Sequence, residues 1–141
     1  METVLRILAA REHSRAELRR KLRARGNNSE LVEQVLDDLE SRGYLSDFRF
    51  TELYVAERKR KGYGPLRILQ ELKEKGISED LIAQQMNPSD PDWRELLEQV
   101  AQRKLGANPP ADRKTQAKWA RFLEYRGFAA EQIRDLLWKR E

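Results

Sequence analysis

Apolar residues recur along the chain at helical spacings, which is the pattern of helices that bury one face. At three places such a helix is followed by a glycine, and the three glycines lie 50 and 51 residues apart. The matching positions are Leu18, Leu22 and Gly26, then Ile68, Leu72 and Gly76, and finally Trp119, Leu123 and Gly127. Because glycine readily adopts the left-handed conformation just past a helix end, each set marks the same point of a repeated unit.

Each of these helices has one apolar helical pattern before it and another after it. The preceding patterns cover residues 4–8, 50–54 and 93–100, and the following ones cover residues 31–39, 81–86 and 133–137. No stretch shows the strict alternation of a half-buried strand. The sequence therefore predicts an all-α protein of three tandem three-helix, helix-turn-helix-like repeats, at residues 1–45, 46–88 and 89–141. Stacked units of this kind form an elongated, curved body.

The starts of the middle helices carry recognisable capping residues. Ser14 and Glu17 have the spacing of a capping box. Pro65, which follows Gly64, suits the first position of a helix, and Asp112 is the expected cap in the third unit. We expect the middle helix of each unit to begin at these points.

The composition changes the picture only in part. Hydrophobic residues make up 39 % and charged residues 37 % of the chain, so the charged fraction is above that of a typical globular domain. There is no cysteine, which excludes disulfides and thiolate metal sites and is typical of the reducing cytoplasm. No apolar run approaches the ~20 residues that cross a bilayer, and residues 1–10 lack the pattern of a signal peptide. We therefore expect a cytoplasmic protein with no membrane partner.

The net charge of +4 conceals alternating basic and acidic blocks. Residues 1–26 hold 8 basic and 3 acidic side chains, whereas residues 27–57 hold 2 and 8. Basic blocks return at 58–75 and 102–141, and an acidic block at 76–101 separates them. Alternating surfaces of this kind suit a protein partner at least as well as a nucleic acid.

Residue types with catalytic or metal-binding chemistry form no recognisable site. The single histidine, His13, precedes a helix cap and is expected to be a solvated loop residue. The sequence lacks the GxSxG, HExxH and phosphate-binding GxxxxGK(S/T) motifs. Glu33, Asp37, Asp38 and Glu40 are expected to form the solvated face of a helix. The sequence therefore predicts a protein that is not an enzyme and that has no cofactor or metal.

The strongest candidate for a binding site is a run of four cations at residues 58–61, followed by Tyr63 and Arg67. Cations at a helix C-terminus are favoured by the helix dipole, but four of them with an aromatic residue and a further arginine exceed that need. A phosphate-rich or acidic partner is the better explanation. The candidate partner- or DNA-binding residues of the chain are Arg15, Arg19, Arg23, Arg58, Lys59, Arg60, Lys61, Tyr63, Arg67, Lys118 and Arg121.

Three-helix units also invite comparison with helix-turn-helix DNA readers, whose last helix enters the major groove. In the first unit that helix, at residues 29–42, carries five acidic side chains and only Arg42 as a cation. In the second unit it begins Ser-Glu-Asp at 78–80 and holds no cation through residue 86. DNA phosphates repel such helices, which argues against sequence-specific reading by them.

Several segments of the chain together resemble the RecX family of regulatory proteins. They are GYLSDFRF at residues 43–50, RKRKGYGPLRI at 58–68, QELKEKGIS at 70–78, ILAAREHS at 7–14, ELRRKL at 17–22 and RFLEYRGF at 121–128. The central motif is long and specific, and the resemblance extends over residues 4–138.

The resemblance implies a bacterial modulator of the RecA recombinase with three tandem three-helix repeats. RecX-family proteins bind RecA filaments on single-stranded DNA, in the filament groove, and inhibit filament extension, ATP hydrolysis, strand exchange and the coprotease activity of RecA. This implies a role in homologous recombination, DNA repair and the SOS response, with the RecA filament as partner of a monomer and single-stranded DNA contacted directly or through the filament. Two alternatives stay open: an autonomous DNA-binding protein of tandem helix-turn-helix type, and an adaptor for another acidic protein.

Overall fold

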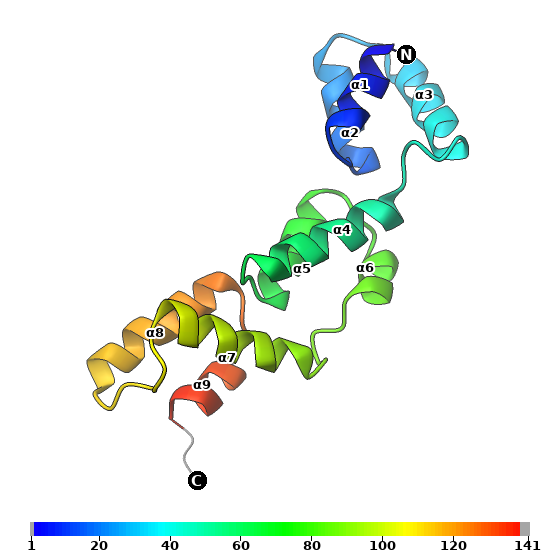
Figure 1. Ribbon diagram of the computed structural model, residues 1–141. Coiled ribbons are helices and arrows are strands. Elements are labelled where there is room, and N and C mark those ends of the chain that lie inside the picture. The colour runs from blue at the N-terminus through cyan, green and yellow to red at the C-terminus, as the bar shows by residue number, and fades with distance from the viewer. Residues whose placement is uncertain (1, 139–141) are drawn as a thin grey trace. The chain divides into compact units, whose positions relative to one another are not determined.

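The computed structural model describes residues 2–138 (Figure 1). Over these residues the chain forms nine helices and no strand, which confirms the predicted all-α fold of three three-helix sets. The helices are α1 (Glu2–Ala10), α2 (Arg15–Ala24), α3 (Ser29–Ser41), α4 (Asp47–Arg60), α5 (Pro65–Glu74), α6 (Glu79–Gln85), α7 (Asp92–Lys104), α8 (Arg113–Arg126) and α9 (Ala130–Leu137).

The middle helices begin where the capping residues indicate. The Ser14 hydroxyl accepts a hydrogen bond from the Glu17 amide, and the Glu17 carboxylate accepts one from the Ser14 amide, which completes the capping box of α2. α5 begins at Pro65, and Asp112 accepts a hydrogen bond from the Thr115 amide at the start of α8. The side-chain caps satisfy backbone N–H groups that have no partner inside their helices.

The chain divides into two compact units. Unit 1 comprises Met1–Tyr54 and Leu72–Gln85, and unit 2 comprises Val55–Glu71 and Met86–Glu141. Unit 1 therefore contains α1, α2, α3 and α6, and unit 2 contains α7, α8 and α9. The two remaining helices, α4 and α5, contribute residues to both units.

An apolar core holds α1, α2 and α3 together in unit 1. Its buried members are Val4, Leu18, Leu22, Val32, Leu36, Leu39 and Leu45. The helical pattern places residues 31 and 32 together in the apolar stripe of α3, but Leu31 is 52 % exposed. The buried face of α3 passes through residues 32, 36 and 39, and Leu31 lies to one side of it.

Hydrogen bonds join the start of α2 to the turn after α5, within unit 1. The buried Ser14 hydroxyl donates a hydrogen bond to the Lys75 carbonyl oxygen at 2.7 Å, and Lys75 Nζ donates to Glu17 Oε2 at 3.1 Å. Burial opposes the charge of Glu17, but hydrogen bonds from Ser14, Lys75 and Arg11 outweigh it and hold the pKa of Glu17 below its ordinary value. The capping box of α2 therefore also makes a tertiary contact.

His13 is only 1 % exposed, so the prediction of a solvated loop residue is wrong. Its Nδ1 lies 3.1 Å from the Arg11 carbonyl oxygen, and its Nε2 lies 2.7 Å from Lys21 Nζ. A neutral ring satisfies both contacts, with Nδ1 donating to the carbonyl and Nε2 accepting from the ammonium. Burial lowers the pKa of His13, and the cations of Arg11 and Lys21 act in the same direction. The prediction failed because the burial of His13 depends on how the turn before Ser14 packs in the folded unit. The local sequence does not reveal this packing.

Ion pairs join α2 to α3 in unit 1. Arg19 donates to both carboxylate oxygens of Glu33, at 2.6 and 3.0 Å. Arg15 donates to Glu33 at 3.1 Å and to Asp37 at 2.7 Å, and it also contacts Glu40. The hydrogen bonds from Arg19 and Arg15 lower the pKa of Glu33 to about 2. Asp37 and Glu40 are exposed, as the prediction of a solvated face expects, but these carboxylates also hold α3 against α2 through their ion pairs.

The core of unit 2 lies among α7, α8 and α9, of which α7 and α8 run side by side (Figure 1). Its buried members are Leu97, Val100, Ala101, Leu123, Phe128, Ile133 and Leu137. Most of these positions belong to the apolar faces that the sequence predicts. The core leaves the outer side of α7 free to carry polar side chains.

Two backbone segments approach each other closely in unit 2. The Gly64 amide donates a hydrogen bond to the Arg126 carbonyl oxygen at 2.7 Å, and the Leu66 amide donates to the Gly127 carbonyl oxygen at 2.9 Å. A Cβ on Gly64 would lie 2.5 Å from the Gly127 carbonyl oxygen, well inside van der Waals contact. Glycine at position 64 therefore permits the start of α5 to bind the end of α8.

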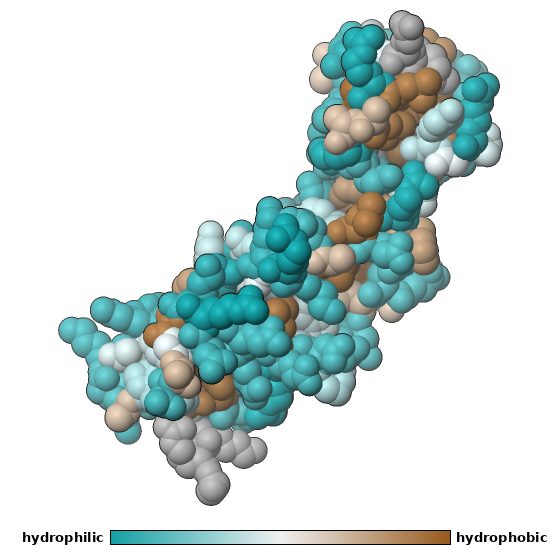
Figure 2. All heavy atoms as spheres, in the orientation of Figure 1, coloured by the Kyte–Doolittle hydropathy of each residue, from teal (hydrophilic) through white to brown (hydrophobic). Residues whose placement is uncertain are grey.

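No helix among residues 2–138 is long and apolar enough to span a membrane. In the view of Figure 2, hydrophilic residues cover most of the visible face, and hydrophobic residues show as small separate patches. The residues on this face are therefore mainly polar or charged.

We predict that Gly64→Ala lowers the free energy of unfolding of unit 2 by at least about 2 kcal/mol, because the added Cβ forces two hydrogen-bonded segments apart. Gly26→Ala is the control, since a Cβ there meets no atom within 4 Å and only the left-handed φ of 86° opposes it. We expect the control to cost about 1 kcal/mol. Urea unfolding followed by circular dichroism measures both costs, and equal values would contradict the steric argument.

We predict that the stabilising effect of Glu33 disappears in acid. Because the pKa of Glu33 is about 2 in the folded chain and 4.5 ordinarily, its contribution is complete above pH 4.5 and is lost as the pH falls towards 2. The urea midpoint of Glu33→Gln should therefore differ most from that of the unaltered protein near neutral pH. Glu30→Gln, an exposed position on the same helix, serves as the control. A difference that is constant with pH would show that the ion pairs with Arg15 and Arg19 do not stabilise the fold.

Candidate partner-binding groove

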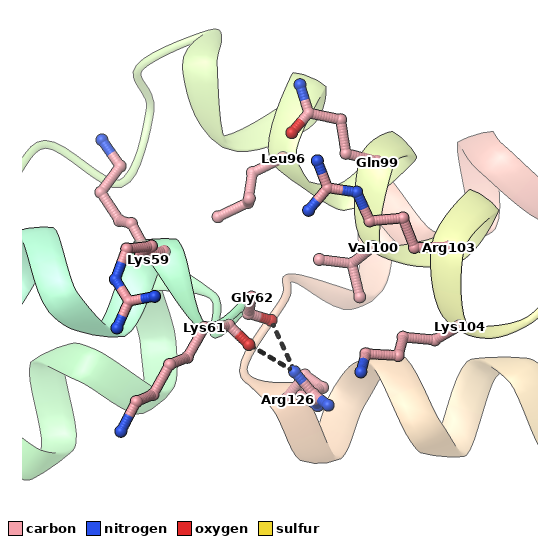
Figure 3. Close-up of a pocket in the computed structure, with 10 residues that line it drawn as sticks. Lys59, Lys61, Gly62, Leu96, Gln99, Val100, Arg103, Lys104 and Arg126 are labelled. Carbon is pink, nitrogen blue, oxygen red and sulfur yellow. Dashed lines mark hydrogen bonds between the residues drawn. The ribbon is translucent and has the colours of Figure 1, made fainter.

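An open groove of about 400 Å³ lies in unit 2, between the end of α4 and one face of α7. In Figure 3 the side chains of Leu96, Val100 and Arg103 extend from α7 towards the end of α4. The lining residues are Lys59, Arg60, Lys61, Gly62, Leu96, Gln99, Val100, Arg103, Lys104 and Arg126. We call this the basic groove.

Six of the ten lining residues of the basic groove are cations and none is acidic. Glu57, one turn back on α4, accepts hydrogen bonds from Arg60 at 2.6 and 3.1 Å and lies 3.6 Å from Lys61 Nζ. The Arg60 hydrogen bonds lower the pKa of Glu57, so this carboxylate stays charged. Arg103 and Lys104 form no ion pair with any residue in the described part of the chain. The groove therefore retains an excess of positive charge.

Arg126 fixes the turn that forms one wall of the basic groove. Its Nη1 donates to the carbonyl oxygens of Lys61 at 2.9 Å and Gly62 at 3.2 Å, as the dashed lines in Figure 3 show. Its guanidinium also lies over the Tyr63 ring, 4.8 Å from the centroid. Since Gly62 has a left-handed φ of 87°, the chain turns sharply there, and Arg126 satisfies the two carbonyls that the turn leaves without helical partners.

Beside the groove, three arginines surround the ring of Tyr63. Arg58 lies 3.9 Å and Arg67 lies 4.6 Å from the ring centroid, with Arg126 completing the set. Arg58 donates to both carboxylate oxygens of Glu71, at 2.9 and 2.7 Å, and Arg67 donates to the same carboxylate at 3.1 Å. The charges of Arg58 and Arg67 are thus engaged in ion pairs within the fold.

The structure separates the candidate residues from the sequence into four groups. Lys59, Arg60 and Lys61 line the basic groove, and Arg58, Tyr63 and Arg67 form the cluster beside it. Lys118 and Arg121 are exposed on α8 and do not line the groove. In unit 1, Arg15 and Arg19 form the ion pairs with α3, whereas Arg23 is exposed and makes no ion pair with the described residues.

The candidate residues from the sequence include only three of the ten residues that line the groove. Gln99, Arg103 and Lys104 come from α7, and Arg126 comes from the end of α8. The sequence feature that could have indicated this wall of the groove is the pair of cations at residues 103–104, which begins a basic block where α7 ends. Their position opposite residues 59–61 depends on the packing of α7 against the end of α4, which the sequence pattern does not specify.

The groove is suited to binding anions rather than to holding a metal. Among the described residues, no three histidine, aspartate or glutamate side chains lie together as metal ligands. Cationic side chains around a partly apolar floor attract carboxylates or phosphates and exclude cations.

Comparison with known proteins places all three helix sets in one family. Family models described as the first, second and third three-helix domains of RecX match residues 1–39, 46–86 and 91–137. The chain is 45 % identical over 135 residues to regulatory protein RecX of Pseudomonas entomophila, covering 96 % of this chain and 87 % of that protein. It is 41 % identical over 133 residues to regulatory protein RecX of Halorhodospira halophila, covering 94 % and 83 %.

Solved structures agree on the fold. A crystal structure of a regulatory protein RecX matches with a TM-score of 0.79 and 23 % identity, covering 96 % of this chain and 68 % of that one. The crystal structure of RecX from Lactobacillus salivarius matches with a TM-score of 0.75 and 21 % identity, covering 96 % and 90 %. With three matching domain models and relatives above 40 % identity, the chain belongs to the RecX family of regulatory proteins.

Proposed function

We propose that this protein is a negative modulator of the RecA recombinase. It binds RecA filaments on single-stranded DNA, in the filament groove, and inhibits filament extension, ATP hydrolysis, strand exchange and coprotease activity. The observation that carries the proposal is the basic groove of unit 2 in a chain of the RecX family. A polyanionic assembly is the partner that six clustered cations suit best.

The same proposal includes how the protein works. It acts by binding as a monomer in the cytoplasm, and it catalyses no reaction. The lining of the groove supports action by binding, because lysine and arginine side chains around Leu96 and Val100 offer contacts to a partner. The arginines around Tyr63 hold the groove wall in place and so prepare it for binding.

An autonomous DNA-binding protein of tandem helix-turn-helix type is the weaker candidate. In such proteins the last helix of a unit enters the major groove. Here α3 carries Glu33 and Asp37, which are paired with arginines of α2 inside the unit. α6 carries exposed Glu79 and Asp80 in its first turn and no basic residue. Phosphates are repelled from both helices, so neither suits the role of a recognition helix.

We predict that Arg103→Ala/Lys104→Ala weakens inhibition of RecA by about fivefold. The variant loses exposed ion pairs with the partner, and each such pair is worth up to ~1 kcal/mol. The assay is steady-state ATP hydrolysis by RecA on single-stranded DNA, with the regulator at substoichiometric amounts. The unaltered protein should slow hydrolysis, and the loss should be largest at low salt.

Arg113→Ala/Lys114→Ala is the matched control, since it removes the same two charges from exposed positions of unit 2 that do not line the groove. The control should inhibit as well as the unaltered protein. If the unaltered protein leaves hydrolysis unchanged at equimolar amounts, the proposed function is wrong. If both double variants lose inhibition equally, total charge matters rather than the groove.

A further inference from the structure

The floor of the basic groove is aliphatic, although its walls are charged. Leu96 is half-buried and Val100 is 5 % exposed, and both belong to the lining. In Figure 3 their side chains point into the space between the cations of α7 and the end of α4. A ligand that fills the groove therefore meets apolar carbon atoms in the middle and cations at both sides.

Among residues 2–138, no aromatic side chain lines the groove. The rings that lining residues contact lie outside the groove. Trp93 is 2 % exposed, with Lys59 Nζ 4.7 Å from its ring centroid, and Tyr63 and Phe122 are half-buried, each with the Arg126 guanidinium over its ring. Proteins that bind single-stranded nucleic acids without sequence preference usually stack bases on exposed aromatic rings. The groove lacks this means of holding a base, and its aliphatic floor has no counterpart in a phosphodiester backbone.

Peptide chemistry fits the same surface better. Carboxylates match the lysines and arginines of both walls, and an aliphatic side chain matches Leu96 and Val100. The exposed amide of Gln99 both donates and accepts hydrogen bonds, as a peptide group does.

We propose that the basic groove binds an acidic peptide segment of a protein partner, with an aliphatic residue of that segment seated on Leu96 and Val100. This inference rests on the proposed function in one respect: the acidic segment belongs to the protein of the filament, so the groove binds protein rather than DNA. Acidic side chains on either side of the aliphatic residue pair with residues 59–61 on one wall and residues 103–104 on the other.

Direct binding to the full chain tests the proposal without any recombinase. The probes are a short fluorescein-labelled peptide with one leucine flanked by glutamates, the same peptide with serine in place of leucine, and labelled oligothymidylate. Fluorescence anisotropy at low salt measures their affinities. We expect the leucine peptide to bind about fivefold more tightly than the serine peptide, because only the leucine buries apolar surface on the floor.

Gln99→Glu tests whether the leucine peptide lies in the groove. The new carboxylate repels the peptide and lies one helical turn from Arg103, so affinity should fall about fivefold or more. Gln102→Glu is the control, because it makes the same change on the same helix at an exposed position outside the basic groove. Its affinity should match that of the unaltered protein.

Three outcomes overturn the inference. Equal affinity for the leucine and serine peptides means that the aliphatic floor is unused. Tighter binding of oligothymidylate that is lost in Gln99→Glu assigns the groove to nucleic acid. Absence of binding by every probe leaves only a solvated cationic surface. Peptide binding together with unchanged RecA activity would contradict the proposed function alone, whereas RecA inhibition without peptide binding would contradict this inference alone.

Discussion

The close approach of the Gly64 and Gly127 backbones is the constraint on which unit 2 depends. Two backbone hydrogen bonds join the segments, and Arg126 adds two more to the turn at Lys61 and Gly62. Together they set the end of α4 against the end of α8. Since α7 packs on α8 through the shared core, the same contacts also fix the distance between the two walls of the basic groove. A side chain on Gly64 would disturb the fold and the groove at once.

Arginines serve two different purposes in this chain, and their partners distinguish them. Arg15 and Arg19 pair with carboxylates of α3, and Arg58 and Arg67 share Glu71. The bidentate pairs of Arg19 with Glu33 and of Arg58 with Glu71 orient helices and leave little charge for a partner. Within the described part of the chain, the cations of the groove form ion pairs with one carboxylate, that of Glu57. The charge of these paired arginines is therefore engaged inside the fold, whereas cations such as Arg23, Lys118 and Arg121 stay exposed outside the groove.

The binding surface follows from this separation of roles. A rigid, charged surface favours the binding of a charged partner, because a preorganised surface loses less conformational entropy on binding. The cluster around Tyr63 supplies the rigidity, and residues on α4 and α7 supply the charge. The aliphatic floor between them adds a means of choosing among acidic partners, since charge alone does not discriminate a peptide from a nucleic acid.

The sequence by itself determined the helices, their caps and their grouping into three similar sets, because apolar spacing, glycines past helix ends and capping residues all act over a few residues. It also located residues 58–61 as a binding candidate. Only the tertiary structure decided that His13 is buried, that Arg58 is held by Glu71, and that Arg103 and Lys104 share a groove with Lys61. These outcomes depend on contacts between helices far apart in the chain, and no local pattern records which charges find partners there.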